Sequence, residues 1–246
     1  MNIIRFMFFI IIIFSSIKST LWKDFKISNK SEEKSILFIK EEEKGEIIEL
    51  WSHHFKFGSI LQSRKNISDS HRLEDAYTQM MGILTAIHPK PEKVLSLGLG
   101  GGCLPRFHLF HYEYSTIVSV EIDPSIVELY YSHFNHNNND DTRHKIIISC
   151  AFDFIMNSSK KNDYDIIWVD VCDFFDTWRL IPESFKKKDF IKNTKKMLKT
   201  DGFLIVNLSS REMDYADVYC SQFKSCILIQ LYNSVENTHI FLNSES

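Results

Sequence analysis

The sequence predicts an α/β fold, in which a seven-stranded, Rossmann-like sheet is preceded in the chain by a small N-terminal β-sheet. Three observations predict this fold. From Val94 onward, short apolar runs alternate with stretches of helical periodicity, as a parallel sheet requires. A glycine-rich turn, Gly98–Gly102, follows the first apolar run. Before that turn, apolar and polar residues alternate, as in an antiparallel sheet with one exposed face.

The N-terminal sheet is expected over residues 34–62, where charged residues separate runs of alternating character. These runs are 34–41, 46–51 and 55–61. A helix is expected over 74–87, because apolar residues recur there at helical spacing until His88-Pro89 ends the pattern. The main domain is expected to span residues 70–246.

The main domain is expected to contain seven strands, of which the last two form a closing pair. The expected strands are 94–97, 117–122, 145–149, 164–171, 203–208, 226–231 and 238–243, and the expected helices between them are 125–134, 152–156 and 185–198. The run at 164–171 is continuous and apolar, as a central strand covered on both faces should be.

Residues 1–19 are expected to be a signal peptide. Arg5 gives a positive start, Phe6–Phe14 is an unbroken apolar run, and small residues follow near a cleavage point. The run is shorter than the roughly 20 residues that a membrane-spanning helix needs. We therefore expect the secretory pathway or the extracellular space, with no stable membrane span after cleavage. The alternative is an uncleaved anchor, or a wrongly assigned start and a cytoplasmic protein.

Composition argues against two classes of partner. The net charge of −3 at pH 7 comes without the basic stripe of a nucleic-acid-binding protein. None of the five cysteines forms a C-x-x-C pair and the histidine spacings fit no common site, so no metal site is expected.

In a secreted chain, Asn29, Asn66 and Asn157 are candidate glycosylation sites, whereas Asn207 follows a buried run and is expected to stay unmodified.

The glycine turn is the strongest functional signal. Gly98, Gly100 and Gly102 form a G-x-G-x-G pattern, and the helix that opens at Leu104-Pro105 would present free amides to a ligand. A dinucleotide fingerprint would need a third glycine where Cys103 stands. The spacing is closer to that of an S-adenosylmethionine-binding loop, although a plain structural turn is the alternative.

Acidic residues follow the expected strands at the edge where open α/β sheets bind ligands. Glu121 ends the second strand, where a carboxylate can accept hydrogen bonds from ribose hydroxyls or cap the helix near Ser125. Asp170 and Asp173 follow the central strand. These two carboxylates would orient an incoming amine and take its proton, or they are solvated loop residues.

Six segments carry a family resemblance: VLSLGLGGGCLPR, VSVEIDPSIVEL, IIISCAFDFI, YDIIWVDVCD, IPESFKKKDF and MLKTDGFLIVNL. In order and spacing they resemble the spermidine synthases. They resemble more closely the spermidine-synthase-like domain of methyltransferase-like proteins that modify lysine or the N-terminus of a translation elongation factor. The resemblance implies the S-adenosylmethionine-dependent methyltransferase fold, with seven strands and an antiparallel end.

The resemblance also implies roles for individual residues. The glycines would surround the methionine part of the cofactor, Glu121 would hold its ribose, and Cys150 with Ala151 would lie at its adenine. Asp170 would be the general base, and Asp173 the second acid that holds the substrate amine. The implied cofactor residues are Gly98, Gly100, Gly101, Gly102, Glu121, Cys150 and Ala151, and the implied substrate residues are Gln62 and Tyr77.

Two positions depart from the family pattern. Cys150 stands where the family has an acid for the adenine amino group, and a thiol is a poor acceptor. Phe174 follows Asp173, where the synthases have Asp-Pro, which counts against a polyamine synthase.

Three functions follow as hypotheses. The first is S-adenosylmethionine-dependent methyl transfer to an amine or protein acceptor. The second is aminopropyl transfer from decarboxylated S-adenosylmethionine, which a cavity without a group for the methionine carboxylate would favour. The third is a secreted, catalytically inactive binding protein on the same fold. A homodimer is a further expected assembly.

Overall fold

The computed structural model describes residues 21–28, 35–41, 45–54, 58–135, 142–175, 178–209, 212–231 and 238–244. The expected signal peptide at 1–19 and the candidate glycosylation site Asn29 lie outside these ranges. Within them, no helix has both the length and the apolar character to cross a membrane.

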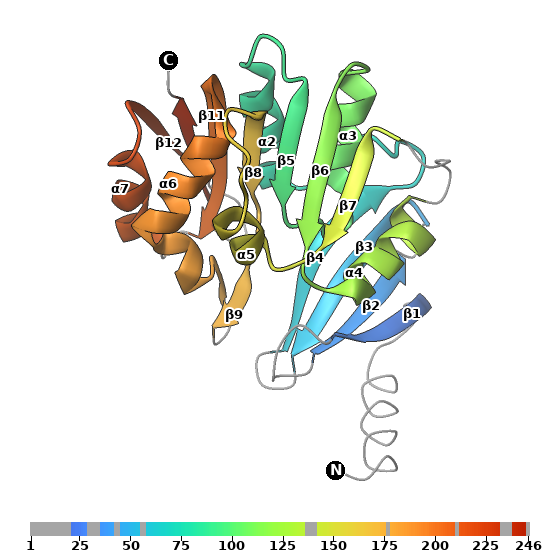
Figure 1. Cartoon of the computed structure of the whole chain (residues 1–246). Coiled ribbons are helices and arrows are strands. Elements are labelled where there is room, and N and C mark those ends of the chain that lie inside the picture. The colour runs from blue at the N-terminus through green and yellow to red at the C-terminus, as the bar shows by residue number, and fades with distance from the viewer. Residues whose placement is uncertain are drawn as a thin grey trace.

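The N-terminal sheet has four antiparallel strands in the order β1 (Leu21–Ser28), β2 (Ser35–Glu41), β3 (Ile47–His54) and β4 (Gly58–Asn66). It lies below the main sheet in Figure 1. Leu37, Ile39 and Leu50 are buried in the same core cluster as Leu99 and Leu104 of the main domain. Strand β1 was not predicted from the sequence, whereas β2, β3 and β4 confirm the antiparallel sheet with shifted bounds.

The main sheet has seven strands, in the order β12-β13-β11-β8-β5-β6-β7. Its strands are β5 (Lys93–Leu97), β6 (Thr116–Glu121), β7 (His144–Ile148), β8 (Tyr164–Val169), β11 (Leu198–Ser209), β12 (Ser225–Leu231) and β13 (Thr238–Ser244). Strands β11, β8, β5, β6 and β7 are parallel, and β13 is antiparallel to both β11 and β12. This topology confirms the predicted Rossmann-like fold with an antiparallel end.

Helices cover both faces of this sheet (Figure 1). They are α2 (Ala76–Ala86), α3 (Cys103–His111), α4 (Pro124–Leu129), the π-helix η1 (Tyr130–Phe134), α5 (Ala151–Met156), the 3₁₀-helix η2 (Glu183–Lys186), α6 (Lys188–Met197) and α7 (Met213–Cys220). Strand β8 is buried along its whole length, as its apolar sequence predicted. Trp168 packs on the α2 side and donates its indole N–H to Thr85 Oγ1 at 3.0 Å, whereas Ile167 lies in the opposite cluster with Phe190 of α6.

Several local features were not predicted. The expected helix over 125–134 is divided into α4 and η1, and α7 has no counterpart in the prediction. A short hairpin, β9 (Asp173–Phe175) and β10 (Trp178–Leu180), follows the central strand. Cys220 and Cys226 form a disulfide between the end of α7 and the start of β12.

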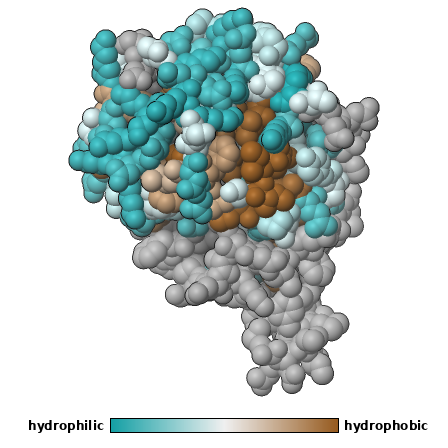
Figure 2. All heavy atoms as spheres, viewed as in Figure 1, coloured by the Kyte–Doolittle hydropathy of each residue, from teal (hydrophilic) through white to brown (hydrophobic). Residues whose placement is uncertain are grey.

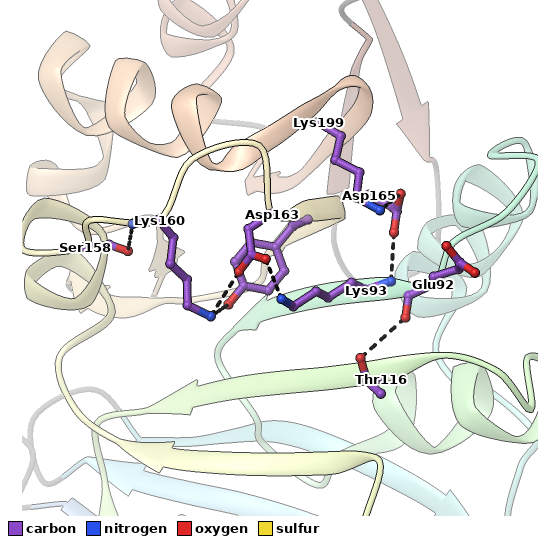
Figure 3. Close-up of polar contacts among 9 residues, drawn as sticks. Glu92, Lys93, Thr116, Ser158, Lys160, Asp163, Asp165 and Lys199 are labelled. Carbon is purple, nitrogen blue, oxygen red and sulfur yellow. Dashed lines mark hydrogen bonds and ion pairs between the residues drawn. The ribbon is translucent and has the colours of Figure 1, made fainter.

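An ion cluster joins the amino ends of β5, β8 and β11 (Figure 3). The glycine turn follows the other end of β5, at the opposite edge of the sheet. Asp165 accepts hydrogen bonds from the Lys93 amide and from Lys199 Nζ, both at 2.8 Å. Asp163 pairs with Lys93 and, at 3.0 Å, with Lys160. Burial works to raise the pKa of Asp163, but the hydrogen bonds from the two lysines outweigh it and lower that pKa. These charges are satisfied among themselves, so the cluster is structural.

Hydrophobic residues form a band on the face of the molecule shown in Figure 2, over the part of the sheet that contains β6 and β7. Ile147 pairs with Val120 in the register of these strands, and both Val118 and Val120 belong to the cluster on the α5 side. Val118 and Ile147 are only half-buried there, because α5 is six residues long and covers little of this edge.

Candidate functional site

A cavity of about 260 Å³ lies between the carboxyl ends of the parallel strands and the N-terminal sheet. This is the edge at which open α/β sheets bind ligands. All the predicted site residues except Gly101 and Gly102 line it. The predicted residues that line the cavity are Gln62, Tyr77, Gly98, Gly100, Glu121, Cys150, Ala151, Asp170 and Asp173. The structure therefore brings together residues from β4, α2 and the ends of four parallel strands.

Gly98 places the glycine turn in close contact with Asp170, the residue that follows the central strand β8. Its φ is +98°, and a Cβ on this residue would lie 2.2 Å from the backbone oxygen of Asp170. The Asp170 amide in turn donates to the Leu97 carbonyl at 2.9 Å. Any side chain at Gly98 would displace Asp170, so glycine is required for both the conformation and the close approach.

The other glycines have different surroundings. Gly100, with φ +52°, lines the cavity. A Cβ on Gly101 would lie 2.7 Å from the ring of Phe134, and one on Gly102 would lie 2.2 Å from the ring of Tyr130. Gly101 and Gly102 thus pack against η1 and do not line the cavity, so the structure does not place them where the resemblance expects cofactor contacts.

The Glu121 carboxylate holds the glycine turn. Its Oε2 accepts a hydrogen bond from the Leu99 amide and its Oε1 accepts one from the Asp123 amide, each at 3.0 Å. A carboxylate oxygen can accept more than one hydrogen bond and Glu121 lines the cavity, so the predicted ribose role is compatible with this geometry. Glu121 does not cap α4, which was the alternative, because Asp123 does so by accepting from the Ser125 amide at 2.9 Å.

Asp123 was missed as a residue of the cavity wall, although the sequence held a signal for its cap. An Asp followed by Pro and Ser is typical of a helix start. The side chain is 2% exposed and lines the cavity.

Asp170 has a partner that the sequence reasoning did not assign. Asn207 Nδ2 donates to Asp170 Oδ1 at 2.9 Å. The register of β11 and β8 explains this contact, since Val206 pairs with Val169 and the next residue on each strand is Asn207 or Asp170. Because Nδ2 is the atom that would carry a glycan, its contact supports the expectation that Asn207 stays unmodified. Asp173 is exposed, at the start of β9.

Cys150 and Ala151 form the wall at the end of β7. Cys150 is a half-exposed free thiol that precedes α5, and its side chain makes no capping hydrogen bond to this helix. Cys172, which follows β8, also lines the cavity and is half-exposed, whereas the thiol of Cys103 is buried. Burial raises the pKa of the Cys103 thiol.

The cavity is acidic. Four carboxylates line it: Glu121, Asp123, Asp170 and Asp173. No lysine, arginine or histidine is found among the described residues of the lining. A concave site with charge of one sign concentrates ligands of the opposite sign, so this cavity favours a cationic ligand.

The remaining wall, formed by Pro182, Ser184 and Phe185, is held by a buried glutamate that was not predicted from the sequence. Glu212 is 2% exposed and accepts hydrogen bonds from the Ile181 amide at 2.9 Å and the Ser209 amide at 3.0 Å. Lys186 pairs with Glu212 at 3.3 Å. Burial works to lower the pKa of Lys186, but its contacts with Glu183 and Glu212 outweigh it and raise that pKa.

Comparisons with known proteins agree with this arrangement. The chain is 31% identical over 151 residues to the eEF1A lysine and N-terminal methyltransferase of Bos taurus, which covers 59% of this chain and 21% of the relative. It is 30% identical over 145 residues to the polyamine aminopropyltransferase of Vibrio vulnificus, which covers 58% of this chain and 46% of the relative. The chain thus spans about a fifth of one relative and about half of the other.

A solved structure, human methyltransferase-like protein 13 in complex with SAH, matches with a TM-score of 0.59 and 26% identity. The match covers 69% of this chain and 82% of the solved chain. The family model of the spermine/spermidine synthase domain matches residues 74–232, which is more than half of the sequence. The chain therefore belongs to the spermine/spermidine synthase domain family.

Proposed function

We propose that this protein is a transferase that moves an alkyl group from the sulfonium of an S-adenosylmethionine-type cofactor to an amine. The observation that carries the proposal is the meeting of Gly98, Glu121 and Asp170 in one acidic cavity. The similarity to methyltransferases and to aminopropyltransferases supports the same class of reaction. Both kinds of relative share this family, and the proposal concerns the chemistry common to them.

The residues of the cavity fit such a cofactor. Gly98 and Gly100 line the cavity, and a Cβ on either would collide with its wall, at the Asp170 carbonyl or at Ser63 Oγ. Glu121 lines the cavity, and its carboxylate is the kind of acceptor that ribose hydroxyls donate to. The carboxylates of the lining complement a positive charge. A bound sulfonium would supply a carbon activated for displacement by a nitrogen lone pair.

Asp170 would act on the acceptor. An amine attacks only with a free lone pair, so it must lose its proton before or during the reaction. The Asp170 carboxylate lies at the cavity wall, where the hydrogen bond from Asn207 orients it, and a carboxylate in this position would take the amine proton. In the transfer the new N–C bond forms, the S–C bond breaks, and its electron pair stays on sulfur. Exposed Asp173 would hold the amine at the mouth.

Methyl transfer is the first candidate within this class. The GLGGG turn and the Asp173-Phe174 sequence favour it, as does the likeness to the methyltransferase of elongation factor eEF1A.

Aminopropyl transfer is the second candidate, and one observation favours it. A cofactor that retains its methionine carboxylate needs a partner for that negative charge, and no basic side chain is found among the described residues of the lining. Decarboxylated S-adenosylmethionine lacks this carboxylate, so it would bind in the acidic cavity without needing a basic partner.

Calorimetric titration with S-adenosylmethionine, its decarboxylated form and methylthioadenosine tests the proposal. Micromolar binding of the first ligand supports methyl transfer and justifies a search for the amine acceptor. Preference for the decarboxylated form supports aminopropyl transfer. Failure of a folded protein to bind any of the three contradicts both, and supports an inactive binding protein.

We also propose that the protein enters the secretory pathway. The expected signal peptide at 1–19 supports this, and so does the Cys220–Cys226 disulfide, since such bonds persist mainly in oxidising compartments. N-terminal sequencing of the protein recovered from its own cells tests the cleavage. An intact Met1 in a cytosolic fraction would contradict the proposal.

A further inference from the structure

Strand β4 of the N-terminal sheet is hydrogen-bonded to the glycine turn. Its three consecutive residues Ser63, Arg64 and Lys65, here named the β4 clamp, contact three segments of the main domain. The hydrogen bonds run from the Gly101 amide to Ser63 Oγ (2.9 Å), from Cys103 Sγ to the Arg64 carbonyl (2.9 Å), and from Lys65 Nζ to the Phe134 carbonyl (2.8 Å). The clamp therefore reaches the turn, the start of α3 and the end of η1.

Ser63 fits the turn closely. It is 8% exposed, and it also lines the cavity. A Cβ on Gly100 would lie 2.7 Å from Ser63 Oγ, and one on Gly101 would lie 2.9 Å from Ser63 Cβ. The Gly101 amide is buried, so without the serine hydroxyl it would lose its acceptor in a place that water does not reach freely.

The opposite side of Gly101 is fixed as well. Arg106 Nη1 donates to the Gly101 carbonyl at 3.1 Å and to the Phe134 carbonyl at 3.3 Å. Arg106 and Lys65 are 5% and 8% exposed, and their positive charges lie at the carboxyl end of η1, where the helix dipole is negative. Both backbone groups of Gly101 are thus held by side chains from outside the turn.

We propose that Ser63 is a positioning residue of the nucleoside site. By fixing the Gly101 amide, it holds the neighbouring Gly98–Gly100 in the conformation that lines the cavity, and so makes the N-terminal sheet a part of the site. This inference rests on the proposed function, because it assumes that the glycine turn holds the nucleoside. Ser63 acts through the turn, not on the reacting atoms.

The test compares Ser63→Ala with Ser63→Thr, which keeps the hydroxyl, in the full chain. Ser59→Ala, an exposed serine on the same strand, is the control. Hydrogen exchange is followed by mass spectrometry in a peptide that contains Gly98–Cys103, without ligand. Binding of S-adenosylhomocysteine is measured by calorimetry. For Ser63→Ala we expect faster exchange in this peptide and about tenfold weaker binding, since the buried amide loses its acceptor. Ser63→Thr and Ser59→Ala should resemble the wild type.

The two readouts separate failure of this inference from failure of the proposed function. Wild-type protein that does not bind S-adenosylhomocysteine contradicts the proposed function, while the exchange of the turn peptide still tests the clamp. Unchanged exchange and unchanged affinity in Ser63→Ala overturn the inference. Faster exchange spread over the whole protein also overturns it, because a general loss of stability would then explain the effect. Exchange at the end of η1, which Lys65 holds, should stay as in the wild type.

Discussion

The side-chain amide of Asn207 donates to Oδ1 of Asp170 across 2.9 Å, joining the ends of two neighbouring parallel strands. This hydrogen bond orients the carboxylate that we propose takes a proton from the acceptor. Asn207→Ala should lower turnover by about 10- to 100-fold with little change in affinity for S-adenosylhomocysteine, because it disturbs a proton acceptor and not the nucleoside. Release of S-adenosylhomocysteine or methylthioadenosine measures turnover.

Asn207→Asp is a sharper variant at the same position. It places a second carboxylate beside Asp170, and two like charges at this distance favour protonation of one of them. The rise of turnover with pH should therefore move to higher pH. An unchanged pH profile in Asn207→Asp would show that Asp170 does not take the proton.

Gly98→Ala should abolish nucleoside binding and destabilise the fold by about 2–4 kcal/mol, because the new Cβ would meet the Asp170 carbonyl. Gly58→Ala is a matched control, since Gly58 has a similar φ of +87° and a Cβ there would meet no atom of the described residues within 4 Å. Gly58→Ala should lower the free energy of unfolding by about 1 kcal/mol, from backbone strain alone. Urea unfolding and calorimetry measure both effects, and equal losses in the two variants would contradict the role of close approach.

Cys150→Asp should tighten binding of S-adenosylhomocysteine about tenfold, by restoring a strong acceptor where the resemblance places the adenine amino group. This ligand lacks the sulfonium charge, so the added negative charge does not attract it in general. Cys150→Ala is the control for the lost thiol. If the aspartate variant binds no better than the alanine variant, the adenine does not lie at Cys150.

Lys65 should make stability depend on alkaline pH. Burial, with the nearby Arg106 guanidinium, lowers its pKa from 10.5 to about 8. Between these values the unfolded chain holds a proton that the folded chain has released, so the free energy of unfolding rises with pH in this window. This gain in the free energy of unfolding is lost as the pH falls through the folded-state pKa of about 8. We expect the free energy of unfolding to rise by about 2 kcal/mol. This is less than the full pKa shift would give, because partial solvent access screens the charge.

Urea unfolding at pH 7.5 and pH 10.5 measures this effect as the difference between the wild type and Lys65→Met, in which the rise should disappear. Lys145→Met, at an exposed position of β7, is the control and should keep the rise. The same pH dependence in Lys65→Met and the wild type would contradict the assignment.

Glu212→Gln should destabilise the protein by about 2–3 kcal/mol, because it leaves Lys186 beside a neutral, buried partner and weakens the hold on Ile181. Glu183→Gln is the matched control: Glu183 also pairs with Lys186, but its side chain is 76% exposed. The control should cost less than about 1 kcal/mol. Thermal unfolding distinguishes the two, and similar shifts in melting temperature would argue against the buried contact.

The sequence predicted the main sheet well, because its signals are local. The apolar runs of β5, β8 and β11 and the glycine turn between β5 and α3 each identify their own element. The cavity could also be predicted, since the ends of parallel strands meet at one edge. Glu121, Cys150 and Asp170 lie there for this reason.

The features that escaped prediction depend on contacts between distant segments. Asn207 reaches Asp170 only through the register of β11 and β8. Glu212 and Ser63 act on backbone amides far away in the chain, so neither belongs to a local motif. The glycines at 101 and 102 face η1, and no spacing rule indicates which side of a turn meets a ligand. Helix α7 lies against η2 and the end strands, and its sequence alone gave too weak a periodicity.

The place of β13 between β11 and β12 has a consequence for the order of assembly. Strand β12 reaches the sheet only through β13, although it is made first. During synthesis the edge of β11 stays bare until residues 238–244 are available, and a bare edge is a template for pairing with other chains. Asn207 pairs with Ile240 on this edge, so the strand segment that holds the partner of Asp170 gains its second neighbour in the same late step. A chain interrupted before Thr238 would therefore expose the β11 edge to aggregation and lack the strand that pairs with Asn207, the partner of Asp170.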